Sequence, residues 1–239
     1  KVIQTDENSG LYDNDVVEEF IKRNKNQSKS IPILSIIRLQ AVHHPYGWIS
    51  KAKMDSEYIK KYPFVWNSPS KTTWFAGKKE KVDQLNVINS YKNSVRSVDY
   101  QVWRIAESLK KNNTYNNTIL VVASDHGHSL FDAIEPEESN GHGYKPYNNQ
   151  TNIYLAMKFA NNLPKKSFAE NLIVGSVDIN PTILDYLNVD YQSLYSDLPM
   201  VGVSMLKKTK NRCIISFQPK YDFQRGLNNP ELLTDFSFD

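Results

Sequence analysis

Apolar residues recur at helical spacing over one long stretch in the middle of the chain. Spacings of three and four positions place these residues on one face of a predicted helix: Ile88, Tyr91, Val95, Val98, Val102, Ile105 and Leu109. The polar segment 112–117 ends this helix. Two shorter helices are predicted, one over 14–25 with Asp13 or Asn14 as its N-cap, and one over 176–187 with Pro181 in its first turn.

Short apolar runs, rich in β-branched residues, predict strands between these helices. The runs lie at 31–42, 118–124, 152–160 and 213–217. Residues 46–79, which contain three of the four Trp, are interpreted as an irregular segment over one end of the sheet. Because strands that alternate with helices form mainly parallel sheets, we predict an α/β fold with a mainly parallel, helix-covered sheet.

Composition and charge narrow the function classes only a little. With 239 residues, the chain can hold one large α/β domain or two small ones around a real core. The net charge of +3 is small and the Lys and Arg are dispersed, which does not favour nucleic-acid binding but would tolerate an anionic substrate or a membrane surface. No apolar run approaches the ~18 residues of a membrane-spanning helix. Cys213 has no second cysteine with which to pair.

All five histidines fall in two short windows, each of which follows a predicted buried strand. Asp125 and His126 come directly after the strand 118–124, and His43 and His44 follow the strand 31–42. Ligands of open α/β sheets gather at the carboxyl edge of the strands, so we expect both windows to meet there. An Asp–His pair offers the mixed oxygen and nitrogen donors that suit zinc or manganese. Gly127 is expected to allow a sharp backbone turn at this edge.

The functional interpretation competes with an ordinary structural one. A single His after a strand is usually a surface or capping residue, but five of five at strand ends or in glycine-flanked loops favour one shared site. His44 and His128 are the weakest members, since each neighbours a stronger one. Asp178 is better explained as a helix cap than as a ligand, and the carboxylates at 132–138 as a solvated loop.

Five motifs in order resemble the sulfatase / alkaline phosphatase superfamily. They are "NNTILVVASDHG" with the later "NGHG", the long helix before it, "VHHPY", "SVDINPTILDYL" and "VGVSML", and together they cover roughly residues 10–206. The paired Asp-His and the later "HG" look most like the membrane-anchored branch, which includes phosphoethanolamine transferases and lipoteichoic acid synthases. The resemblance implies an alkaline phosphatase-like α/β fold with three layers, helix–sheet–helix, and a mainly parallel sheet.

The same resemblance assigns roles to the histidine windows. Asp125 and His126 would bind a divalent metal, zinc by preference, with manganese, magnesium and calcium as alternatives. His43 and His142 would be catalytic and contact the phosphate or sulfate group or a second metal, and His44 and His128 would contact the substrate. The implied substrate is a phosphate or sulfate ester, a lipid headgroup among the options, and the implied location is extracytoplasmic, on the periplasmic or cell-surface side.

The motifs begin in what looks like the middle of the family's domain. We therefore expect residues 1–210 to be a sulfatase-like domain without its N-terminal nucleophile half, with 211–239 as its C-terminal strand and tail. The leading function is metal-dependent chemistry on phosphate or sulfate esters in a longer parent protein, including phosphoethanolamine transfer, with this part alone inactive. The alternative is a catalytically silent domain that binds lipid headgroups or a partner protein and regulates envelope synthesis.

Overall fold

The computed structural model describes residues 9–25, 31–44, 46–64, 84–131, 140–142, 147–161, 173–190 and 201–207. The chain divides into two compact units, Lys1–Thr118 and Ile119–Asp239, and each is described by itself. The described helices and strands together make a mixed α/β content. The predicted boundary at residue 210 and the predicted strand 213–217 lie outside the described residues. None of the described helices is long and apolar enough to cross a membrane.

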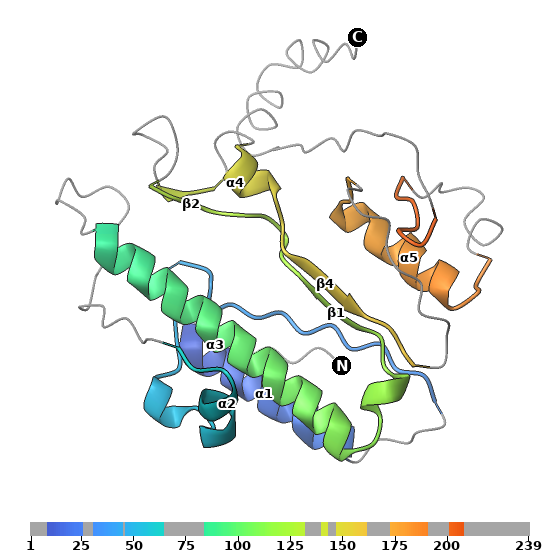
Figure 1. Ribbon diagram of the computed structural model, residues 1–239, viewed down its shortest axis with the longest axis horizontal. Coiled ribbons are helices and arrows are strands. Elements are labelled where there is room, and N and C mark those ends of the chain that lie inside the picture. Colours follow the sequence, from blue (N-terminus) through green and yellow to red (C-terminus); the bar gives the residue numbers. More distant parts are fainter. Residues whose placement is uncertain are drawn as a thin grey trace, which may run out of the picture. The chain divides into compact units, whose positions relative to one another are not determined.

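The first unit is built on two helices that lie side by side, α1 (Ser9–Lys25) and α3 (Gln84–Lys111) (Figure 1). Both confirm the sequence prediction, although α1 begins several residues before the predicted cap. Small polar side chains, such as Ser94 and Ser97, are buried along α3 beside apolar ones such as Ile105. Because serine occupies little volume, α3 can approach its neighbours closely.

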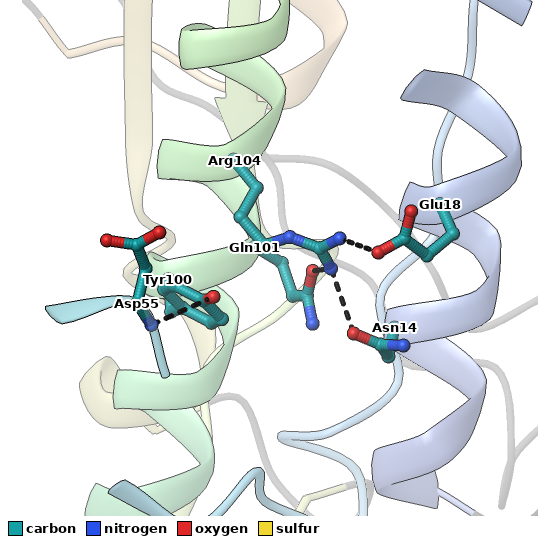
Figure 2. A network of polar contacts seen from close by, with 6 residues as sticks. All are labelled: Asn14, Glu18, Asp55, Tyr100, Gln101 and Arg104. Carbon is teal, nitrogen blue, oxygen red and sulfur yellow. Dashed lines mark hydrogen bonds and ion pairs between the residues drawn. The ribbon is translucent and has the colours of Figure 1, made fainter. Parts of the chain in front are cut away.

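Arg104 ties the two helices together through several polar contacts (Figure 2). Its guanidinium donates to Asn14 of α1 at 2.9 Å and to Gln101 of its own helix at 2.9 Å, and it forms an ion pair with Glu18. The flat, five-donor guanidinium suits such a role because it can bind several acceptors at once. Only 13% of the Arg104 side chain is exposed, so these contacts are partly shielded from water.

An aromatic cluster packs against α3 at Tyr100 and Trp103. Helix α2 (Ser56–Lys61) brings Tyr58 against Tyr100 and Trp103, with ring centroids 5.0 and 5.5 Å away. Met54 completes this core. The Tyr100 hydroxyl accepts a hydrogen bond from the Asp55 backbone at 3.1 Å (Figure 2). The Trp-rich segment therefore contributes to a core of the first unit as far as residue 64.

The prediction of a buried strand at 31–42 is wrong. Residues 32–40 have no regular secondary structure, and Leu34 and Ile36 are 84% and 87% exposed. The apolar, β-branched run favours extended backbone, but a strand also needs a hydrogen-bonded neighbour. None of the described residues pairs with this run in a sheet, so its side chains stay in contact with solvent.

The second unit contains two short antiparallel pairs. Strand β1 (Leu120–Ala123) pairs with β4 (Leu155–Lys158), and β2 (Ser129–Leu130) pairs with β3 (Asn140–Gly141). Strands were predicted at the positions of β1 and β4, and the structure confirms both. The mainly parallel sheet and the three layers are not confirmed, because every strand pair among the described residues is antiparallel.

Asp178 organises the end of the second unit, where the 3₁₀ turn η4 (Ser176–Asp178) leads into α5 (Ile179–Tyr186). Its fully buried carboxylate accepts the backbone N–H groups of Gly175 and Val203, each at 2.8 Å. The next turn of α5 adds Thr182, whose hydroxyl accepts the Met205 N–H at 2.9 Å. Asp178 stands at the N-cap position of α5, as the sequence suggested, but its side chain makes no cap hydrogen bond to that helix and instead fixes the backbone at Gly175 and in the segment 201–207.

Replacing Asp178 with Ala should destabilise the second unit strongly. Two buried backbone N–H groups would lose their acceptor, at about 1–3 kcal/mol each. Asp178→Asn should lie between wild type and Ala, since its amide oxygen still accepts one bond. Urea unfolding followed by circular dichroism measures the change. The exposed Ser176→Ala serves as control, and an Asp178→Ala midpoint equal to that of the control would contradict this role.

Candidate active site

The Asp125–His126 pair lies just beyond the carboxyl end of β1, separated from the strand by Ser124. Both side chains reach solvent, with 79% of Asp125 and 42% of His126 exposed. The His126 backbone N–H donates to the Asp125 carboxylate at 3.0 Å, and the ring Nδ1 of His126 lies 2.8 Å from the Gly127 carbonyl. A carbonyl can only accept, so Nδ1 carries the proton and the lone pair of a neutral His126 ring is on Nε2.

His142 lies against this pair. Its ring centroid is 3.8 Å from that of His126, with the two planes tilted by 32°. His128 also contacts His142, with the Nδ1 atoms of the two rings 3.3 Å apart. Three histidines from the window 124–143 therefore gather beside Asp125, and the expected proximity of His142 to the Asp125–His126 pair is met.

Gly127 is required here by a close approach of two backbones. Its N–H donates to the Gln150 carbonyl at 2.7 Å, at the short helix α4 (Asn148–Thr151). A Cβ atom at Gly127 would lie 2.1 Å from the Asn149 carbonyl oxygen, well inside van der Waals contact. The chain bends at Asp125 and His126, just before Gly127, and Gly127 is not among the described residues with positive φ, so the close approach is what requires a glycine here.

Buried hydrogen bonds that the sequence analysis did not predict hold β2 and α4 together next to this site. Ser129 is fully buried; its hydroxyl donates to Asn149 at 3.1 Å and accepts from Gln150 at 3.0 Å. These bonds join β2 to α4 and so fix the strand that follows His128. No sequence signal separates Ser129 from the many surface serines, because its role depends on a contact twenty residues away.

His43 and His44 belong to the first unit, so their distance from Asp125 stays a prediction. They lie in a tight turn: the His43 N–H donates to the Gln40 carbonyl at 2.9 Å, and Tyr46 N–H donates to the His43 carbonyl at 2.8 Å. The His44 ring contacts the edge of Tyr46, with centroids 5.6 Å apart. Burial lowers the pKa of His44, and the nearby His43 lowers it further.

A buried carboxylate on α1 holds the start of this turn. Asp13, 1% exposed, accepts the backbone N–H groups of Gln40 at 2.6 Å and Ala41 at 3.0 Å. Burial raises the pKa of Asp13, although the two hydrogen bonds act in the opposite direction. The sequence suggested Asp13 as an N-cap, but it lies inside α1 and caps the backbone before His43 instead.

The sequence model of the sulfatase family matches residues 3–189, well over half of the chain. The chain belongs to the sulfatase family. It is 29% identical over 188 residues to the uncharacterized sulfatase YdeN of Escherichia coli K12, a match that covers 76% of this chain and 32% of YdeN. It is also 29% identical over 97 residues to an endo-4-O-sulfatase of Bacteroides thetaiotaomicron, covering 41% of this chain and 18% of that enzyme.

Among solved structures, the Bacteroides fragilis protein yidJ is similar at 23% identity, with a TM-score of 0.48 over 73% of this chain and 36% of yidJ. The chain thus spans about a third of the length of YdeN, and 36% of yidJ. The superfamily suggested by the motifs is confirmed. The resemblance to the membrane-anchored branch stays a prediction, because the relatives named above carry sulfatase names.

Gly127→Ala should disturb the histidine cluster as well as the stability of the second unit. The new methyl group would force two backbones apart, which typically costs about 1–3 kcal/mol in a tightly packed site. We expect a lower urea midpoint and shifted imidazole NMR signals of His126, His128 and His142. Ala123→Ser, at an exposed position of β1, is the control. Unchanged imidazole signals in Gly127→Ala would show that the close contact does not position the cluster.

Asp13→Ala should destabilise the first unit and release the turn that carries His43. Two buried N–H groups would lose their acceptor, so the free energy of unfolding should fall by about 2–4 kcal/mol. Asp15→Ala, exposed on the same helix, is the matched control and should change it by less than about 0.5 kcal/mol. Equal unfolding midpoints for the two variants, with unchanged NMR signals of His44, would contradict an anchoring role for Asp13.

Proposed function

We propose that this chain supplies part of the active site of a metal-dependent sulfate-ester hydrolase. Asp125 and His126 bind the metal, and His43 and His142 contact the sulfate group. The observation that carries the proposal is the packing of His142 on His126 beside the exposed Asp125, at the end of β1 in a sulfatase-family chain. The name of the endo-4-O-sulfatase supports sulfate esters as the substrate class.

The donor groups fit a divalent metal. The Asp125 carboxylate oxygen lies 3.8 Å from His126 Nε2, close to the separation of about 3.3–3.6 Å for two ligands of one tetrahedral ion. The hydrogen bond from Nδ1–H to the Gly127 carbonyl fixes the His126 tautomer and leaves Nε2 as the donor atom, a common arrangement for metal-binding histidines. A mixed oxygen and nitrogen pair accepts zinc or manganese readily, and magnesium or calcium with more oxygen ligands.

Two ligands do not complete a site. Among the described residues, no group of three or more His, Cys, Asp or Glu side chains could hold a metal ion. Further ligands must therefore come from water, from substrate or from residues beyond those described. A bound cation would supply positive charge for the non-bridging oxygens of the ester.

Histidine side chains supply the hydrogen-bond donors and the acid–base groups that the chain itself contributes. An imidazole changes its charge near neutral pH, so His43 or His142 can donate a hydrogen bond to a sulfate oxygen or pass a proton to the leaving alcohol. His44 and His128 adjoin these residues and are proposed to contact the substrate. The lowered pKa of His44 keeps that ring neutral over a wider pH range.

Phosphate esters share the tetrahedral oxygen geometry of sulfate esters and are the competing substrate class. The sequence motifs also predict phosphoethanolamine transfer, a lipid headgroup as substrate and an extracytoplasmic location. These predictions accompany the phosphate-ester alternative. Parallel assays with aryl sulfate and aryl phosphate separate the two classes. Faster turnover of the sulfate is expected.

His43→Ala and His142→Ala in the complete protein should each lower turnover by roughly 10²–10⁴-fold, if the histidine transfers a proton. Asp125→Ala and treatment with a chelator should lower turnover too, and added zinc or manganese should restore the chelated enzyme. The control Tyr154→Phe removes only the hydroxyl of an exposed ring in the second unit. Turnover that survives both His43→Ala and His142→Ala would end the proposal for these residues.

A further inference from the structure

The β2–β3 pair sets two histidines opposite each other. Ser129 pairs with Gly141 and Leu130 with Asn140. The same antiparallel register, continued by one residue, puts His128 across from His142, and side chains of directly opposed residues lie on the same face. The Nδ1 atoms of the two rings are 3.3 Å apart.

This separation is the one expected for two ligands of a tetrahedral ion. Zinc binds imidazole nitrogen at about 2.0–2.1 Å, and the tetrahedral angle then puts two nitrogens about 3.3–3.4 Å apart. Two nitrogens at right angles, as in a square-planar copper or nickel site, would be about 2.9 Å apart. The same distance also allows a direct hydrogen bond from one ring to the other, so metal titration is needed to separate the two arrangements.

We propose that His128 and His142 hold a zinc-type ion between their Nδ1 atoms, separate from the ion proposed for Asp125 and His126. The two remaining positions of a tetrahedral ion would be taken by water or by an oxygen of a ligand. The ion would occupy only Nδ1 of His142 and would leave its Nε2–H as the donor toward the sulfate group. The proposal rests on the strand register and the ring geometry, and it holds whether or not the chain acts on sulfate esters.

The surroundings hold both rings in place. Buried Ser129, bonded to Asn149 and Gln150, fixes the backbone next to His128. The His142 ring packs against the His126 ring, with centroids 3.8 Å apart. The His126 ring is in turn oriented by its contact with the Gly127 carbonyl. A metal site binds more tightly when its ligands are already positioned, because less side-chain freedom is lost on binding.

The two donor pairs differ in the ions that they prefer. The Asp125–His126 pair contains a carboxylate and tolerates calcium or magnesium, whereas the His128–His142 pair offers only imidazole nitrogens, which suit zinc, copper and nickel and not calcium. An excess of calcium should therefore compete with zinc at the first pair and leave the second unaffected. This difference allows the two sites to be tested separately in one protein.

The test is a zinc titration of the metal-free protein by calorimetry, repeated with cobalt(II) to follow its visible absorption. In the presence of excess calcium, wild type and Asp125→Asn should still bind one zinc ion. His128→Asn and His142→Asn should each weaken that binding by more than about tenfold, since even the loss of a residue that only supports a metal ligand costs 10–100-fold. Circular dichroism checks that each variant is folded, and His128→Gln provides a second substitution at that position.

Zinc affinity unchanged in both His128→Asn and His142→Asn would overturn the proposal, and the 3.3 Å contact would then be a hydrogen bond between two imidazoles. Loss of the calcium-resistant ion in Asp125→Asn would overturn it as well, because the two pairs would form one site. Neither result depends on turnover. Failure of the sulfate-ester proposal would instead appear as absent hydrolysis with zinc binding intact.

Discussion

The close backbone contact between Gly127 and the Asn149–Gln150 turn is the constraint on which the histidine cluster depends. It brings the residues after β1 against α4, where a single added Cβ would meet a carbonyl oxygen at 2.1 Å. With that approach in place, the Gly127 carbonyl is turned to accept from His126, and Ser129 reaches its partners on α4. The glycine therefore acts on the chemistry indirectly, by letting two segments approach that any side chain would keep apart.

Two buried aspartates perform the same task in the two units. Asp13 holds the backbone at Gln40 and Ala41, and Asp178 holds the backbone at Gly175 and Val203. Each carboxylate loses solvation on burial, and each recovers part of that free energy through charge-assisted bonds to N–H groups. The raised pKa of Asp13 shows that desolvation is the larger effect there. Such carboxylates fix loops that have no sheet partner among the described residues.

The sequence predicted the elements whose pattern is local. Helix α3 and strands β1 and β4 were found because apolar spacing and β-branched runs act over a few neighbouring residues. It failed at 31–42, where burial depends on a partner strand rather than on the run itself, and it expected parallel pairing where β1 and β4 run antiparallel. Ser129 and the true role of Asp13 were missed for the same reason, since both depend on contacts with distant segments. The proximity of His126 and His142 was predicted, because the loop between the two residues is long enough to fold back.

Strand register explains why His128 belongs to the cluster although it looked like a bystander in the sequence. Neighbouring residues of an extended segment point to opposite sides, so His126 and His128, two apart, can face the same side while Gly127 lies between them against α4. The return strand then supplies His142 opposite His128. A shift of this register by one residue would turn His142 away from both rings. The cluster is therefore specified by two features together, the close contact at Gly127 and the pairing of Ser129 with Gly141, and neither histidine chemistry nor metal affinity is needed to assemble it.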